Sequence, residues 1–195
     1  MENYSDKKII ILECAIDLFK EFDYDKVTIK QICEKASIPK STFHYYYKAK
    51  EDLIKDFFKI TDINASHMMQ AIYTSDNSLE QMWKVIELYY KRLIDAGVSI
   101  SKTVYISNIM EDKHILGVDN AIAKDMYLTF IKRGREKHLI NNTCEDDEKL
   151  LSALVYALTG IAYLWCVQNG NFDLLKECRS VFETVLNYNG SVNNE

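Results

Sequence analysis

The densest group of potentially functional side chains in this sequence lies between Lys40 and Tyr47. Phe43 and Tyr47 are four residues apart, so a helix through this stretch turns both toward the same, inward side. The same helix turns outward two hydroxyl groups, an imidazole and a phenol, which belong to Ser41, Thr42, His44 and Tyr45. Such groups hydrogen-bond to phosphates and to the edges of bases. The stretch therefore predicts a surface that contacts nucleic acid.

A second short helix precedes this one and would hold it in place. Thr28 is a favoured N-cap residue, and apolar residues then recur at the spacing of a helical stripe, at Ile29, Ile32, Cys33 and Ala36. Pro39 disfavours helical geometry at Ile38 but is acceptable where a helix begins. One helix therefore ends near Ser37, and the next begins at Pro39 or Lys40. Two short helices around a tight turn form a helix-turn-helix.

The charge of this region differs from that of the whole chain. The protein has 24 Lys and Arg residues against 29 Asp and Glu residues, so its net charge is -5. Between residues 26 and 50 there are six lysines and one acidic residue, Glu34, which gives a local charge of +5. A basic, aromatic-rich helix-turn-helix on an otherwise acidic chain predicts a footprint for phosphates.

The residues from Phe43 to Leu53 read Phe-His-Tyr-Tyr-Tyr-Lys-Ala-Lys-Glu-Asp-Leu, and this stretch resembles the signature of the tetracycline-repressor (TetR) family of transcriptional regulators. Upstream, Leu18-Phe19, Thr28-Ile29 and the segment 32–36 fit the same family, so the resemblance covers roughly the first 55 residues. It implies that one set of side chains approaches the DNA major groove and its phosphates: Lys40, Ser41, Thr42, His44, Tyr45 and Tyr46. It also implies that a second set holds the DNA backbone: Thr28, Lys30 and Lys50.

Three positions depart from the family pattern. Asp23 and Ser37 stand where the family usually has glycine, and His44 replaces the usual first tyrosine of the recognition helix. A left-handed backbone at Ser37 would cost about 1 kcal/mol relative to glycine. His44 changes the chemistry that faces the groove, so we expect an operator sequence different from those of relatives.

Composition predicts an all-α fold, because 195 residues contain only one proline and six glycines. We expect about nine helices: an N-terminal three-helix DNA-binding head with the helix-turn-helix, and a larger C-terminal helical body for ligand binding and dimerisation. The expected domains are residues 1–49 and 50–190, with a polar tail at 191–195. A fourth helix is expected from about residue 48 to 73, and a fifth, with Ser78 and Gln81 as a capping box, ends at Gly97. Further helices are expected at about 99–110 and 118–138.

Residues 150–167 contain no charged side chain, a length that also suits a membrane span. No cluster of basic residues flanks the segment, and polar residues close it at 168–171, so we favour a subunit interface over a membrane helix. Small residues there would let helices approach closely: Ala153, Ala157, Gly160 and Ala162. Helices at about 148–168 and 172–188 from two subunits would form a four-helix homodimer interface.

The sequence offers little for catalysis. The four histidines lack metal-ligand spacing, and the five cysteines contain no Cys-x-x-Cys pair. We therefore expect no catalytic residue, no metal, no cofactor and a reduced cytoplasmic protein without a signal peptide. Two alternatives stay open: a redox role for Cys166 and Cys178, and a metal site combining Cys144 with the acidic run 145–148.

Aromatic and methionine side chains in the C-terminal part could line a cavity for a small molecule, although such side chains are more often plain core. The candidates are Trp83, Tyr90, Tyr105, Met110, Tyr127, Phe130 and Trp165.

The sequence thus predicts a homodimeric repressor, not an enzyme, that binds double-stranded DNA at an inverted repeat. Two heads are needed because a single recognition helix contacts few bases. A small apolar or amphipathic ligand in the body would release the DNA by a population shift. The alternative is a protein-interaction module of the same fold that has lost sequence-specific DNA binding, an option left open by Ser37 and His44.

Overall fold

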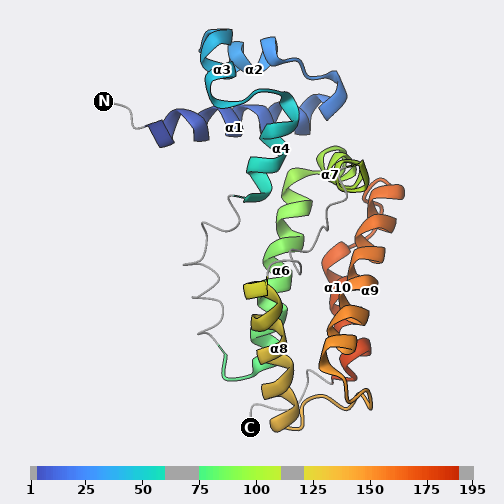
Figure 1. Ribbon diagram of the computed structural model, residues 1–195. Coiled ribbons are helices and arrows are strands. Elements are labelled where there is room, and N and C mark those ends of the chain that lie inside the picture. The colour runs from blue at the N-terminus through green and yellow to red at the C-terminus, as the bar shows by residue number, and fades with distance from the viewer. Residues whose placement is uncertain (1–3, 60–74, 111–120, 189–195) are drawn as a thin grey trace.

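The computed structural model describes residues 4–59, 75–110 and 121–188, and within these ranges the chain forms nine α-helices, one short 3-10 helix and no strand. The predicted all-α class is therefore confirmed. Figure 1 shows a small helical head at one end and a larger helical body below it.

The head contains α1 (Tyr4–Phe22), η1 (Tyr24–Lys26), α2 (Ile29–Lys35), α3 (Lys40–Tyr46) and the start of α4 (Lys50–Lys59). The predicted extension of α4 to residue 73 lies outside the described residues. One apolar cluster holds these helices together, and its most buried members are Ile11, Ala15, Phe19, Ile32, Phe43 and Leu53. The long helix α1 thus packs against the helix-turn-helix.

The turn between α2 and α3 uses a left-handed residue, as the sequence led us to expect. Ser37 has a φ of 52°, and the N–H of Ile38 donates to the Cys33 carbonyl at 3.0 Å. Asp23, which precedes η1, has a φ of 65°. Both positions are therefore ones where glycine would adopt the backbone with less strain.

The body contains α6 (Ser78–Ala96), α7 (Val98–Met110), α8 (Ala121–Glu136), α9 (Asp147–Val167) and α10 (Leu174–Leu186). Gly97 ends α6, as predicted, with a φ of 87°. Asp146 caps α9 by accepting hydrogen bonds from the N–H groups of Glu148 and Lys149, both at 3.1 Å. The first turn of α9 is acidic, as expected for charges that favour the helix dipole.

The predicted capping box of Ser78 and Gln81 is wrong. Asn77 is the N-cap, and its Oδ1 accepts hydrogen bonds from the N–H groups of Leu79 at 2.9 Å and Glu80 at 3.3 Å. A contact distant in sequence also fixes Asn77, because its Nδ2 donates to the Tyr188 hydroxyl at 2.9 Å. The helix therefore starts one residue earlier than the local pattern indicated.

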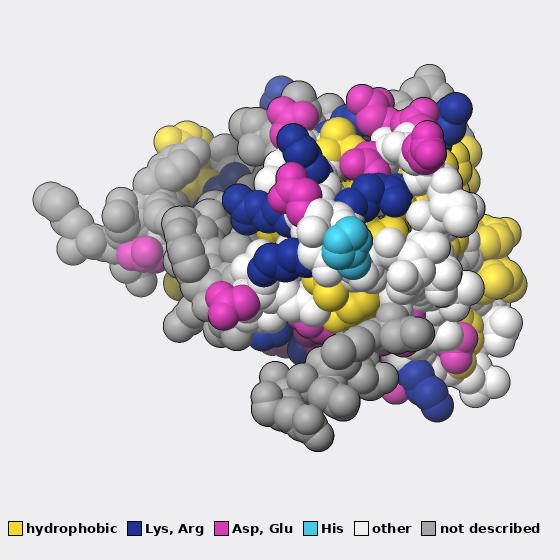
Figure 2. Space-filling view, turned by 90° about the horizontal axis from the view of Figure 1, so that it is seen from below, with side chains coloured by type: hydrophobic (Ala, Val, Ile, Leu, Met, Phe, Trp, Pro, Cys, Tyr) yellow, Lys and Arg dark blue, Asp and Glu magenta, His cyan; other side chains and the backbone are white. Residues whose placement is uncertain are grey.

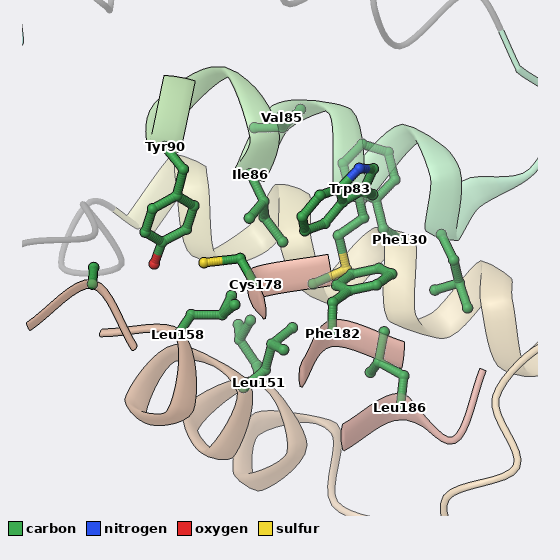
Figure 3. Close-up of a cluster of buried hydrophobic side chains, with 14 of the residues drawn as sticks. Trp83, Val85, Ile86, Tyr90, Phe130, Leu151, Leu158, Cys178, Phe182 and Leu186 are labelled. Atoms are coloured by element: carbon green, nitrogen blue, oxygen red, sulfur yellow. The ribbon is translucent and has the colours of Figure 1, made fainter. Parts of the chain in front are cut away.

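A large apolar cluster lies between α6, α8, α9 and α10 (Figure 3). Trp83 of α6 meets Phe182 of α10 with ring centroids 5.5 Å apart. Gly134 of α8 allows a close approach to α6, since a Cβ at this glycine would lie 2.9 Å from a methyl group of Leu79. The helices are therefore held at distances that leave no room for larger side chains at such points.

The corner between α6 and α7 packs into the head. Ala96, Ile100 and Val104 belong to the same apolar cluster as the helices of the head. Leu53 and Ile54 of α4 lie in that cluster as well, so packing continues across the domain boundary expected between residues 49 and 50. That boundary stays a prediction.

In the described ranges, α9 is the one helix long and apolar enough to cross a membrane, and 39% of its most apolar window is buried inside the protein. The buried side packs on the body core through Leu150, Leu151, Leu154, Leu158, Ala162, Trp165 and Cys166. The opposite side exposes a second apolar stripe.

Candidate nucleic-acid interface

A reciprocal cap fixes the start of α2 at the edge of the helix-turn-helix. The N–H of Gln31 donates to Thr28 Oγ1 at 3.3 Å, and the N–H of Thr28 donates to Gln31 Oε1 at 2.8 Å. The Thr28 hydroxyl also lies 2.8 Å from Gln31 Oε1 and donates to it. The predicted N-cap at Thr28 is confirmed, and Gln31, three residues later, was a readable signal for this capping box.

The orientation predicted for α3 is confirmed. Phe43 is 0% exposed and Tyr47 is 2% exposed, so both face the head core. Tyr47 is held further because its hydroxyl donates to the Lys8 carbonyl at 3.4 Å. Of the six side chains expected at the groove, four are exposed, Lys40, Ser41, His44 and Tyr45, and two are half-buried, Thr42 and Tyr46.

Aromatic rings shape the outward surface of α3. Tyr45 is 69% exposed, and its ring meets that of Tyr46 edge-on with centroids 5.1 Å apart. His44 sits edge-on against buried Phe43, with centroids 5.5 Å apart. The His44 ring thus packs against buried Phe43 while the residue as a whole remains exposed. An exposed imidazole held in this way is suited to hydrogen-bonding the edge of a nucleotide base.

Lys50 occupies a more enclosed place than the resemblance implies. Its ammonium group donates hydrogen bonds to the carbonyls of Tyr24 at 2.6 Å and Val27 at 3.0 Å, and it lies 4.0 Å from the centroid of the Tyr24 ring. Partial burial lowers the pKa of Lys50, against the opposing effect of nearby Asp25 and Glu51. Lys50 therefore braces η1 against α4, and a contact with the DNA backbone stays a prediction.

The other lysines of the head differ in how far they are neutralised. Lys30 lies 3.6 Å from Glu34, Lys35 lies 3.2 Å from Asp17, and Lys26 lies 3.2 Å from Asp23, with most of these groups well exposed. No carboxylate in the described ranges lies within ion-pair distance of exposed Lys40 or Lys48. Among the lysines between residues 26 and 50, Lys40 and Lys48 are thus the most available to a phosphate.

The opposite end of the body carries mixed charge instead. Figure 2 views that end and shows acidic and basic side chains side by side. Several of them are paired: Lys124 with Glu148 at 2.7 Å and Arg135 with Asp147 at 2.6 Å. Since these charges cancel locally, the head offers the better surface for DNA.

Five of the candidate pocket residues are buried in the body core, namely Trp83, Tyr90, Tyr105, Phe130 and Trp165. Tyr127 is half-buried and packs against the same core, whereas the side chain of Met110 lies outside the described residues. The structure brings the six described side chains to one apolar region. Their contact with a ligand stays a prediction.

The thiols of the body show no sign of activation. Burial raises the pKa of Cys166 to about 11 and that of Cys178 to about 12, and Lys102 only partly opposes this effect at Cys166. At neutral pH both are protonated, and the thiolate is the reactive form. Their environment therefore gives no support to the redox alternative.

Two residues that the sequence did not single out join the head to the body. Ser99 of α7 accepts a hydrogen bond on its Oγ from the N–H of Tyr24 at 2.9 Å. Arg92 of α6 donates from Nη2 to the Phe57 carbonyl of α4 at 2.7 Å, and its guanidinium lies 4.6 Å from the Phe57 ring centroid. Neither contact has a local sequence signal, because the partners are 75 and 35 residues apart.

Solved structures share the architecture of the whole chain. The fatty acid degradation regulator FadR of Bacillus halodurans superposes with a TM-score of 0.64 at 15% identity, over 100% of both chains. Thermus thermophilus FadR, described as a TetR-family transcriptional repressor in complex with lauroyl-CoA, gives a TM-score of 0.61 at 16% identity, over 96% of both chains. At such identities the likeness shows a common fold.

The sequence comparisons cover parts of the chain. The transposon Tn10 TetC protein of Escherichia coli is 26% identical over 103 residues, which are 53% of this chain, and the match spans only about half (50%) of that protein. The family model for bacterial regulatory proteins of the tetR family matches residues 11–57, the segment that contains the helix-turn-helix. Residues 11–57 therefore resemble the bacterial regulatory proteins of the tetR family, and the chain as a whole shares its fold with the FadR regulators.

Proposed function

We propose that this protein is a homodimeric repressor that binds an inverted-repeat operator and releases it when a small apolar or amphipathic molecule binds the body. The observation that carries the proposal is the exposed face of α3, which presents His44 and Tyr45 beside the unpaired charge of Lys40. His44 and Tyr45 would read bases, while Lys30 and Lys40 would hold phosphates.

The exposed side of α9 supports a dimer. Tyr156 is 74% exposed, and the apolar or small residues around it recur at helical spacing: Ala153, Gly160, Tyr163, Leu164 and Val167. In Figure 2 hydrophobic side chains reach the surface on the side where α9 lies in Figure 1. Covering such a stripe with a second copy removes apolar surface from water and pairs the two heads for successive major grooves.

The solved relatives suggest the first ligands to try. The FadR of Bacillus subtilis is described in complex with stearoyl-CoA, and that of Thermus thermophilus in complex with lauroyl-CoA. The body core of this chain is apolar and rich in aromatic rings, which suits an acyl chain. Acyl-CoA thioesters are therefore the first effectors to test.

A ligand in the body would reach the DNA through the junction with the head. Arg92 of α6 holds the end of α4 and Ser99 of α7 holds the start of η1, so a shift of the corner between α6 and α7 would move both contacts. The ligand would favour a body conformation in which the two heads no longer fit the operator, and its effect is limited by its differential affinity for the two states.

The test is selection of fragmented genomic DNA on the purified protein across a series of salt concentrations. The matched negative control is a Tyr45→Ala, Lys40→Ala variant, because both side chains are exposed and their loss spares the head core. Lys132→Ala on α8 controls for a lost positive charge elsewhere. Enrichment of an inverted repeat by the wild type and by Lys132→Ala, but not by the double variant, is the expected result.

A second arm separates base reading from phosphate binding. His44→Ala should change the preference among operator variants. Lys40→Ala should instead weaken binding to all DNA sequences alike and reduce the salt dependence of the affinity. If no fragment is enriched at any salt concentration, the result favours the protein-interaction alternative over sequence-specific DNA binding.

A further inference from the structure

Tyr90 carries a polar group for which the fold provides no partner. In the described ranges, the buried side-chain atoms without a hydrogen-bond partner are Tyr24 Oη, Ser78 Oγ, Tyr90 Oη and Arg92 Nε. Tyr24 lies in the head, Ser78 lies at the start of α6, and Arg92 still bonds through another nitrogen. The hydroxyl of Tyr90, in a residue only 1% exposed, is thus the unpartnered group inside the body core.

The surroundings of this hydroxyl are apolar and uncharged. Figure 3 shows Tyr90 extending from α6 toward α9, with its oxygen on the same side as Leu158 and Cys178. The side chains that act electrostatically on the Tyr90 hydroxyl are Cys178, Tyr89, Tyr105 and Tyr127, and none of them is a cation. Burial, followed by the smaller effects of Cys178 and nearby tyrosines, raises the pKa of Tyr90 well above its usual value. The group is therefore a neutral donor.

Packing alone gives no reason for a tyrosine at this position. A phenylalanine would fill the same space without an unpaired hydroxyl, and buried polar groups in proteins are nearly always paired. Tyr105 illustrates the ordinary case in the same core, since its hydroxyl lies 3.5 Å from the Thr159 carbonyl and is directed at it. The Tyr90 hydroxyl is thus a donor for which the described residues supply no acceptor.

We propose that Tyr90 donates a hydrogen bond to an uncharged acceptor, such as a carbonyl oxygen, on an otherwise apolar effector that binds between α6, α9 and α10. This inference rests on the ligand-responsive function proposed above and specifies the chemistry of the ligand. An ionised group is disfavoured at this position, because none of the groups that act on the Tyr90 hydroxyl is a cation that would compensate its burial. The end of the ligand that reaches Tyr90 is therefore a neutral carbonyl, ester, thioester or ether oxygen.

The test is a thermodynamic cycle with matched ligands and matched variants. Medium-chain methyl ketones are compared by calorimetry with the alkenes in which a CH2 group replaces the carbonyl oxygen. Each series is titrated into the full-length wild type, Tyr90→Phe and Tyr105→Phe. The wild type should bind the ketones about fivefold to tenfold more tightly than Tyr90→Phe does, while both bind the alkenes equally. Tyr105→Phe should keep the wild-type preference for ketones.

Other outcomes overturn the inference. Equal losses of affinity for ketones and alkenes in Tyr90→Phe would show a packing effect. Failure of the wild type to bind either series would show that no such site exists. The thermal midpoint of ligand-free Tyr90→Phe should rise, and a fall would show that the hydroxyl has a partner within the protein. Selection of DNA by the ligand-free protein is measured separately, so failure here leaves the test of DNA binding intact.

Discussion

Ser37 is held in a left-handed conformation that favours glycine, with a φ of 52°. Its side chain is exposed and does not contribute to the head core. Replacement by glycine should therefore relieve strain and stabilise the protein by about 0.5–1 kcal/mol, although the added freedom of the unfolded chain offsets part of the gain.

Denaturant unfolding, monitored by circular dichroism, measures this change. Ser37→Ala is the control, because alanine keeps the strained backbone and should give no gain. Equal stability of the glycine and alanine variants would show that the turn carries no strain.

Lys50 and Lys40 should respond differently to truncation. Lys50→Ala removes two hydrogen bonds to carbonyls and the contact with the Tyr24 ring, so it should destabilise the head by about 1–2 kcal/mol. Lys40→Ala should leave the unfolding free energy within about 0.5 kcal/mol of wild type while weakening DNA binding. Thermal unfolding combined with DNA titration separates the two effects. A Lys50→Ala variant as stable as Lys40→Ala would show that its hydrogen bonds contribute nothing.

At the scale of elements, a charged network joins the start of α6 to the end of α10. Arg179 donates to the two carboxylate oxygens of Glu80 at 2.6 and 3.0 Å and to Glu183 at 2.6 Å. Tyr188 donates to Glu80 at 2.7 Å. Burial by itself would raise the pKa of Glu80, but the hydrogen bonds from Arg179 and Tyr188 outweigh it, and the net shift is downward.

This shift predicts how stability depends on pH. The pKa of Glu80 is lower in the folded than in the unfolded state, so its contribution is fully present above the unfolded value of about 4.3 and is lost as pH falls through the folded value. Glu80→Gln should lower stability by about 1–2 kcal/mol at neutral pH and by less in acid. Urea unfolding across this acidic range provides the measurement. A loss independent of pH would contradict the charge-based account.

Local signals made α2 and α3 predictable, whereas contacts distant in sequence were not. The stripe of α2, its cap at Thr28 and the inward side of α3 all follow from spacings of three and four residues. The cap of α6 was misplaced because Asn77 is fixed by Tyr188, which is 111 residues away. The partly buried position of Lys50 and the contacts of Arg92 likewise depend on tertiary packing, which periodicity does not encode.

At the scale of the whole molecule, Gly160 offers a sharp test of the dimer. It lies in the exposed apolar stripe of α9, and a Cβ added there would meet no atom of the protomer within 4 Å. Gly160→Leu should therefore leave the protomer folded but overpack a close helix contact, which weakens dimerisation by about tenfold to 100-fold.

Sedimentation velocity at several concentrations measures the change in dimer dissociation. Thr129→Leu on the exposed side of α8 is the control for an added apolar side chain. An unaltered dimer in Gly160→Leu would place the interface on another surface, and a change in helical content would point to the protomer instead.

The corner between α6 and α7 also determines how this protein could be recombined with others of the same fold. Because Ala96, Ile100 and Val104 complete the core of the head, a head cut after residue 49 and grafted onto a foreign sensor body would leave apolar side chains uncovered. A functional chimaera would need to carry the corner with it, or receive a body whose own corner matches in shape. Domain exchange between such proteins should therefore keep the corner between α6 and α7 matched to the head. Dividing the chain at the end of the helix-turn-helix would separate the two.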